Sequence, residues 1–128
     1  MSIRNAVTAP QAPKSGGPYS SAIQTDGFVF CSGQLGLDPQ TSEMAGADLE
    51  AQTRQTLINL KNVLEAAGSS LEQVVKTTVF LTDMADFARM NAVYAEFFGS
   101  VPPARSTIAV AGLPRGARVE IEAMALRG

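Results

Sequence analysis

The 128-residue sequence contains no histidine, no tryptophan and a single cysteine. Without histidine, the chain can form neither a Ser-His-Asp nor a Cys-His nucleophilic site, and no zinc site that uses histidine. The lone Cys31 cannot form an internal disulfide bond, which favours a reducing, cytoplasmic environment. Any catalysis must therefore use carboxylates, hydroxyls, arginine, lysine, backbone groups or water.

Charge and long apolar runs are also scarce. Charged residues make up 17% of the chain, the net charge is -2, and no basic run occurs, which argues against nucleic acid as a partner. No stretch reaches membrane-spanning length and no leader-like segment opens the chain, so we expect a soluble protein without a membrane partner. The length predicts one domain over residues 1–128.

Apolar periodicity divides the chain into short strands and two helices. Thr25-Asp26-Gly27 lies between two apolar runs and predicts a hairpin turn. Asp48 is suited to cap the first helix and Gly68 to follow its end, while Asp83 or Asp86 caps the second helix. The predicted strands are 22–24, 28–32, 74–81, 105–111 and 118–126, and the predicted helices are 48–67 and 83–98.

This order, β-β-α-β-α-β-β, predicts an α+β fold with a mixed sheet and both helices packed on one face. The segment before Gly17 is expected to be a poorly ordered arm, or an additional edge strand with a loop. The second face of the sheet carries apolar residues that water would not cover well. Because the chain offers no third layer, that face predicts association of identical subunits.

Arg105 stands at a rigid entrance to a strand. Pro102 and Pro103 fix the backbone before it, and strand alternation places Thr107 on the same face. A planar, permanently charged group held in this way is suited to bidentate binding of a carboxylate. The alternative is an ordinary salt bridge at the surface or at an interface.

Two loop positions are further candidates for a binding site. The Gly17-Pro18 bend could project Tyr19 into a pocket as a ring wall, although the ring could equally pack a loop onto the core. Ser32 precedes Gly33, where glycine allows close approach of a ligand; the alternative is a plain turn at the end of a strand.

Asn91 and a pair of carboxylates stand in apolar surroundings. Asn91 lies on the apolar stripe of the second helix, so its amide needs either a structural hydrogen bond or a ligand. Glu120 and Glu122 share one face of the last strand, where one of them could position water as a general base. An ion pair is the alternative for at least one of them.

Several short motifs follow one another in an order typical of a known family. They are Gly17-Pro18-Tyr19-Ser20, Ser32-Gly33-Gln34, Gln52-Thr53, Asn59-Leu60, Val75-Lys76-Thr77-Thr78-Val79-Phe80-Leu81 with Asp83, Met90-Asn91-Ala92-Val93-Tyr94, Pro103-Ala104-Arg105-Ser106 and Val119-Glu120-Ile121-Glu122-Ala123. In these motifs the chain resembles the RidA (YjgF) family of enamine/imine deaminases, from about Pro18 to the C-terminus.

The resemblance implies a chorismate-mutase-like fold, assembled as a homotrimer with ligand clefts between subunits. It also implies hydrolysis of 2-imino acids such as 2-iminopropanoate and 2-iminobutanoate, which arise from 2-aminoacrylate and related enamines, to 2-oxo acids and ammonia. No cofactor and no metal is implied.

The resemblance also assigns roles to individual residues. Arg105 corresponds to the carboxylate-binding arginine and Glu120 to the cleft glutamate, so these two are the predicted catalytic residues. Many members have a cysteine where this chain has Thr107, which removes any thiol role there. The predicted substrate-binding residues are Tyr19, Ser32, Asn91, Arg105 and Thr107.

Other functions remain open at this point. The substrate could be another aminoacrylate or an aminomuconate-type compound, as for some relatives. The chain could instead be a non-catalytic sensor of small carboxylates or a stress-linked interaction protein. Action on RNA is disfavoured by the charge balance and the missing histidines.

Overall fold

Six strands form one sheet in the order β1-β2-β3-β6-β4-β5. The computed structural model describes residues 2–128. Strands β4 and β5 run parallel, and every other neighbouring pair is antiparallel, so the sheet is mixed as predicted. The strands are β1 (Asn5–Ala6), β2 (Ala22–Gln24), β3 (Phe28–Gln34), β4 (Val74–Leu81), β5 (Ala104–Ala109) and β6 (Val119–Leu126).

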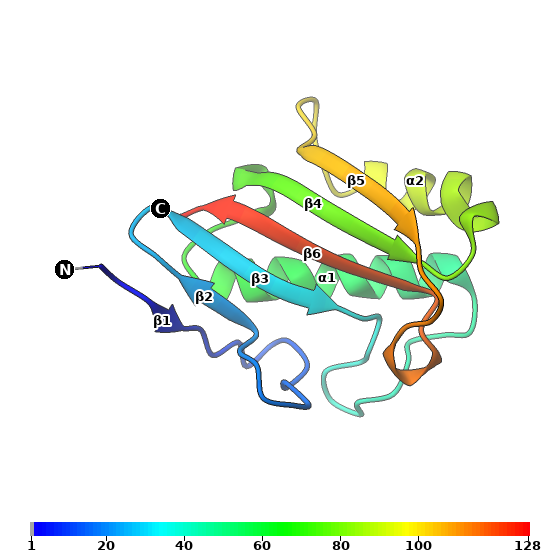
Figure 1. Ribbon diagram of the computed structural model, residues 1–128, viewed down its shortest axis with the longest axis horizontal. Coiled ribbons are helices and arrows are strands. Elements are labelled where there is room, and N and C mark those ends of the chain that lie inside the picture. Colours follow the sequence, from blue (N-terminus) through cyan, green and yellow to red (C-terminus); the bar gives the residue numbers. More distant parts are fainter. Residues whose placement is uncertain (1) are drawn as a thin grey trace.

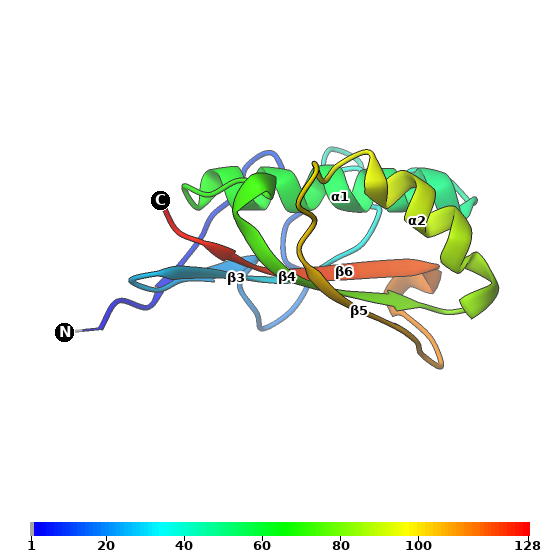
Figure 2. The same ribbon diagram turned by 90° about the horizontal axis from the view of Figure 1, so that it is seen from above.

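Both α-helices, α1 (Leu49–Ala66) and α2 (Phe87–Ala95), cover the same face of this sheet (Figures 1 and 2). Helix α1 packs against β3 and β6 and also against α2. The core lies between these layers, and its largest fully buried side chains include Leu57, Leu60 and Ile121. The predicted α+β architecture is confirmed.

The ends of the elements follow the local chemistry of the sequence. The Asp48 carboxylate accepts a hydrogen bond from the backbone N–H of Ala51 and caps α1. Gly68 follows that helix at φ +77°, the left-handed conformation that glycine adopts without strain. Residues 25–27 form the predicted hairpin turn between β2 and β3.

The start of α2 differs from the expected single cap. Asp83 accepts a hydrogen bond from Ala85 N and caps a short 3₁₀ turn, Met84–Asp86, that precedes the helix. Asp86 makes no capping hydrogen bond. Its buried carboxylate instead binds the guanidinium groups of Arg118 and Arg89 at 3.0 and 3.3 Å. The second helix is therefore shorter than predicted, and an ion pair fixes its first turn.

The N-terminal segment forms the edge strand that was one of its two predicted states. Asn5 pairs with Gln24 and Ala6 with Ile23, which places β1 at one edge of the sheet. The chain then crosses to β2 through a loop that contains the Gly17-Pro18 bend.

The face of the sheet away from the helices is apolar over much of its area. Phe28 and Phe30 on β3 pair with Leu126 and Met124 on β6, and all four side chains are 38–44% exposed. Figure 2 shows both α-helices on the other side of the sheet, so neither covers this face. An uncovered apolar area of this kind is typical of an interface, and the association of subunits stays a prediction.

No helix within residues 2–128 has both the length and the apolar character needed to cross a membrane.

Candidate functional site

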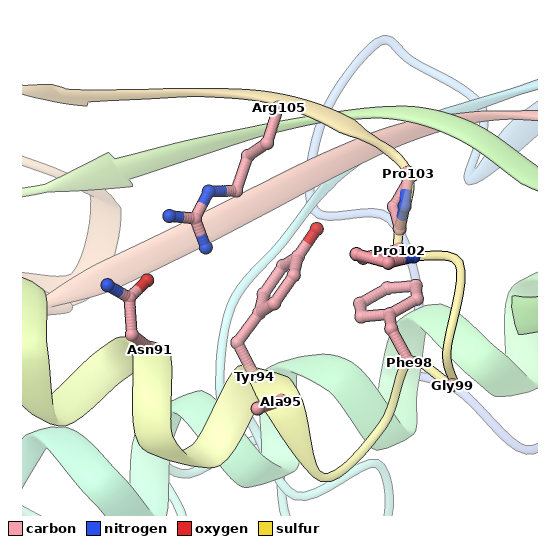
Figure 3. Close-up of a pocket in the computed structure, with 8 residues that line it drawn as sticks. All are labelled: Asn91, Tyr94, Ala95, Phe98, Gly99, Pro102, Pro103 and Arg105. Carbon is pink, nitrogen blue, oxygen red and sulfur yellow. The ribbon is translucent and has the colours of Figure 1, made fainter.

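Arg105 lies on the helix-covered face of the sheet. On β5 it pairs with Thr77 of β4, which in turn pairs with Ala123 of β6, and both of these neighbours are buried beneath the helices. The guanidinium carbon stands 4.8 Å from the ring centroid of Tyr94 and 5.5 Å from that of Phe87 (Figure 3 shows the first of these two rings). Both distances are in the range of cation–π attraction, so the two rings hold the charged group in place.

The Tyr94 ring is itself fixed by its neighbours. Its hydroxyl shares a 2.7 Å hydrogen bond with the Thr77 hydroxyl, and its ring lies 4.6 Å from the ring of Phe98. Burial raises the pKa of Tyr94, so the phenol stays neutral beside Arg105. Arg105 is therefore held on a rigid aromatic support.

Three polar groups here have no ion-pair or hydrogen-bond partner among residues 2–128. Arg105 takes part in none of the ion pairs found among residues 2–128, so the salt-bridge alternative is not seen within this chain. Asn91 Oδ1 and Thr107 Oγ1 are buried and lack hydrogen-bond partners. The structural hydrogen bond considered for the Asn91 amide is thus not seen at Oδ1 in the described chain. The unpaired guanidinium can bind an anionic group of a ligand, and the two buried oxygens can accept hydrogen bonds from its polar groups.

A cavity of about 420 Å³ opens beside Arg105. Figure 3 shows Arg105 and Asn91 on one side of the Tyr94 ring and Phe98 with the prolines on the other. The lining residues are Asn91, Tyr94, Ala95, Phe98, Gly99, Pro102, Pro103 and Arg105.

Tyr19, Ser32 and Glu120 form a second group on the opposite face. Glu120 of β6 pairs with Phe80 of β4, and Phe80 pairs with Ile108 of β5. Along each strand these residues alternate with those that share a face with Arg105, so their side chains point to the opposite face of the sheet. The three side chains line a cavity of about 400 Å³ together with Gly33, Leu35, Pro114 and Glu122.

The loop residues of this group are held by short hydrogen bonds. The Ser32 hydroxyl donates to the backbone carbonyl of Ser20 at 2.6 Å, which ties the end of β3 to the preceding loop. The Tyr19 hydroxyl accepts from Gly16 N at 3.2 Å while the side chain stays 52% exposed. Tyr19 therefore does not pack into the core, and its ring is available to a ligand or a neighbouring molecule.

Glu120 occupies an environment suited to a base. Burial, followed by the nearby Glu122 carboxylate, raises the pKa of Glu120 above its ordinary value. Neither glutamate forms an ion pair with any residue between 2 and 128, contrary to the structural ion pair expected for at least one of them. Arg118, the basic residue closest in sequence, is bound to Asp86 instead.

The six predicted site residues thus divide into two half-sites on opposite faces. Arg105, Asn91 and Thr107 form what we call the arginine half-site, and Tyr19, Ser32 and Glu120 form the glutamate half-site. Within one chain the sheet separates them. The sequence did not predict that Phe87 and Tyr94 support Arg105. These two residues are seven positions apart on the apolar stripe of the second helix, which also holds Asn91.

Two further observations concern possible metal ligands and the thiol. Across residues 2–128 no group of three or more acidic or cysteine side chains is arranged to hold a metal ion. Burial raises the pKa of the Cys31 thiol to about 12, so it is not a nucleophile at neutral pH.

Comparison with known proteins shows to which family the chain belongs. The sequence profile described as endoribonuclease L-PSP matches residues 9–127. The chain belongs to the RidA (YjgF) family. One relative in this family is a RutC family protein of Pyrococcus horikoshii, 49% identical over 98% of this chain and 99% of its own length. Another, from mouse, is named 2-iminobutanoate/2-iminopropanoate deaminase and is 45% identical over 98% of this chain and 93% of its own.

A solved RidA-family structure agrees with the fold. The crystal structure of E. coli TdcF with bound serine superimposes with a TM-score of 0.92 at 40% identity, and the match covers 97% of this chain and 99% of that one. The family resemblance seen in the sequence motifs is therefore confirmed.

Proposed function

We propose that this protein hydrolyses 2-imino acids, such as 2-iminopropanoate and 2-iminobutanoate, to 2-oxo acids and ammonia. The observation that carries the proposal is the Arg105 guanidinium, which rests on two aromatic rings and has no carboxylate partner among residues 2–128. The mouse relative bears the name of this activity, and E. coli TdcF was solved with serine, itself an amino carboxylate.

The complete site is proposed to form between copies of the chain. The arginine half-site of one subunit would face the glutamate half-site of another, because a single sheet keeps them apart. The exposed apolar face around Phe30 and Met124 supplies surface for such an interface. We propose a homotrimer, a closed ring in which each subunit contributes one half to each of two sites.

The reaction needs only orientation, charge complementarity and a placed water. Water adds to C2 of the imine, forming a C–O bond while the C=N electron pair moves to nitrogen, which takes a proton. The resulting carbinolamine collapses to a C=O bond as the C–N bond breaks. In this collapse the hydroxyl proton of the carbinolamine passes to the nitrogen, so both protons of the water leave on ammonia, and water and imine give one 2-oxo acid and one ammonia.

The residues divide this work. Arg105 binds the substrate carboxylate through two N–H donors and so fixes C2. Glu120 accepts a proton from the attacking water, and its raised pKa brings it nearer to neutral pH, where a general base is most effective. Tyr19 forms a wall of the cleft, while Ser32, Asn91 and Thr107 orient the polar groups of the substrate and the water.

A coupled assay tests the proposal. Threonine dehydratase supplies 2-iminobutanoate, and the release of 2-oxobutanoate is followed with and without this protein at a pH where spontaneous hydrolysis is slow. The protein should accelerate release, and Arg105→Ala should abolish the acceleration while the oligomer stays intact. Arg54→Ala removes an exposed arginine paired with Glu96 and serves as the matched control that retains activity.

Two outcomes would contradict this function. Activity of Arg105→Ala close to that of the parent protein would overturn the carboxylate-binding role. Absence of any acceleration, with 2-oxobutanoate nonetheless bound, would leave the protein a carboxylate-binding sensor instead of an enzyme.

A further inference from the structure

We propose that Lys14 and Arg115 form a cationic entrance beside the glutamate half-site, which attracts substrates that carry a carboxylate. This inference rests on the proposed function and adds two residues that favour anionic over uncharged substrates. It concerns a third cavity, which adjoins the glutamate half-site.

Three loops enclose this cavity, whose volume is about 510 Å³. They are the loop between β1 and β2, the loop between β3 and α1, and the connection from β5 to β6, and all three lie at the lower edge of the molecule in Figure 1. Tyr19, Leu35 and Pro114 line both this cavity and the one that contains Glu120. The two spaces therefore share a wall, and a charge in one acts at short range on a ligand in the other.

The charged residues that line this cavity are both cations, Lys14 and Arg115. Both are exposed, and neither forms an ion pair with any residue from 2 to 128. Their field is not cancelled by a neighbouring carboxylate and reaches about 10 Å at 0.1 M salt. The cavity is thus positive, although the chain as a whole carries a net charge of -2.

The adjoining half-site has the opposite charge. Glu120 and Glu122 line it, and neither carboxylate is paired with a cation in the part of the chain that the structure describes. They repel a substrate carboxylate that approaches this face, and Arg105 of the same chain lies on the other face of the sheet. Two cations beside the half-site offset this repulsion and raise the local concentration of anionic substrate.

Arg115 is held at this entrance by an unusual backbone. Its φ of +62° is left-handed, a conformation uncommon for residues other than glycine. Its Nη2 donates a 2.6 Å hydrogen bond to the backbone carbonyl of Ser42, whose φ is also +62°. Both residues line the cavity, and backbone strain of this kind is concentrated at functional sites. The strained pair is a second observation, independent of charge, that points to a function for Arg115.

Lys14 extends from a loop that is anchored on both sides. Pro13 before it is buried and has a fixed φ, and Gly16 after it donates its backbone N–H to the Tyr19 hydroxyl at 3.2 Å. The ammonium group itself is exposed on a flexible stem, so Lys14 acts through its charge and not through a fixed contact.

Binding of 2-oxobutanoate, the product of the proposed reaction, measures the effect without turnover. Titration calorimetry compares the parent protein with Lys14→Gln and Arg115→Gln at about 0.01 M and about 1 M salt, where the Debye length is about 30 Å and about 3 Å. At low salt each substitution should weaken binding about two- to fivefold, and at high salt the difference should disappear. Arg115→Lys, which keeps the charge, should retain most of the affinity.

Lys61→Gln is the matched control. It removes the same charge from α1, where the exposed Lys61 pairs with Glu65, and should bind 2-oxobutanoate as the parent does. The uncharged 2-oxobutanamide controls for structural damage, and its binding should not respond to any of these substitutions. In the coupled assay with 2-iminobutanoate, the loss in Lys14→Gln and Arg115→Gln should fall on kcat/KM at low salt, with kcat changed less than about twofold.

The outcomes separate this inference from the proposed function. If 2-iminobutanoate is hydrolysed but Lys14→Gln and Arg115→Gln behave as Lys61→Gln does at both salt concentrations, the inference is overturned and the deaminase function stands. An equal loss of affinity for 2-oxobutanoate and 2-oxobutanamide would also overturn it, since charge would then play no part. If no imine is hydrolysed but the salt-dependent loss of 2-oxobutanoate binding is found, the entrance stands and the function fails. Absence of both turnover and binding would overturn both.

Discussion

The carboxyl group of Glu120 lies directly against the backbone of Gly33. A Cβ atom on Gly33 would overlap this carboxyl group and would stand 2.7 Å from its Cδ and 2.9 Å from its Cγ. Real Cβ atoms essentially never approach other heavy atoms this closely. Glycine at the end of β3 is therefore what allows the glutamate to occupy its place in the glutamate half-site.

Gly33→Ala should displace Glu120 and lower kcat at least about tenfold with little loss of stability, because the glutamate can swing toward solvent. Gly27→Ala is the matched control, since a Cβ there meets nothing within 4 Å. Steady-state kinetics and thermal unfolding of both variants check this. Full activity of Gly33→Ala would show that the position of Glu120 does not matter.

Phe87→Leu should raise KM several-fold while kcat changes little. The ring of Phe87 stands 5.5 Å from the Arg105 guanidinium, and leucine keeps the apolar volume without the π-face that attracts the cation. Phe97→Leu, a nearby aromatic that does not contact Arg105, is the comparison for general packing effects. An equal effect of both changes would refute a specific role for the Phe87 ring.

Glu122→Gln should move the acid limb of the pH–rate profile to lower pH. Proton acceptance requires ionised Glu120, so the rate rises with pH through the pKa of that group. The Glu122 charge contributes to the raised pKa of Glu120, and its removal lowers that pKa toward the ordinary value. Glu72→Gln, distant from this half-site, should leave the limb in place. A limb that does not move in Glu122→Gln would exclude Glu120 as the group that titrates.

Asn59→Leu should reduce the free energy of unfolding by about 2–4 kcal/mol. The fully buried Asn59 amide donates to the backbone carbonyls of Leu35 and Leu37 at 2.9 and 2.8 Å and ties α1 to the loop after β3. Leucine leaves both carbonyls unsatisfied. Asn62→Leu is the control, because the Asn62 amide is exposed. Urea unfolding measures the free energy of unfolding of both variants. Equal stabilities of the two variants would contradict this account.

The order of elements could be predicted from sequence because each is specified locally. The β-branched run 74–81, the Asp48 cap and the turn at residues 25–27 all appear where expected. The start of α2 was narrowed to Asp83 or Asp86, and the helix begins directly after Asp86. The ion pair at this position could not be predicted, because Asp86 is bound by Arg118, 32 residues further along the chain, and a local motif does not reveal such a partner.

The sequence named candidate site residues but did not predict how they are arranged. Strand alternation correctly placed Thr107 with Arg105 and Glu120 with Glu122. It did not show that these two pairs lie on opposite faces of the sheet. That depends on the register in which β6 pairs with β4, and these two strands are far apart in the sequence. The aromatic support of Arg105 was hidden for the same reason, since β5 and α2 meet only in the folded chain.

Mixing two inactive variants tests most directly whether the site is shared between subunits. Arg105→Ala and Glu120→Gln are each purified, unfolded together in equal amounts and refolded, with mixed assemblies verified by mass spectrometry. If one subunit supplies Arg105 and its neighbour Glu120, about a quarter of the interfaces regain both residues by random assembly, and deaminase activity should return to roughly that fraction of the parent value. Verified mixed assemblies that stay inactive would contradict the shared site.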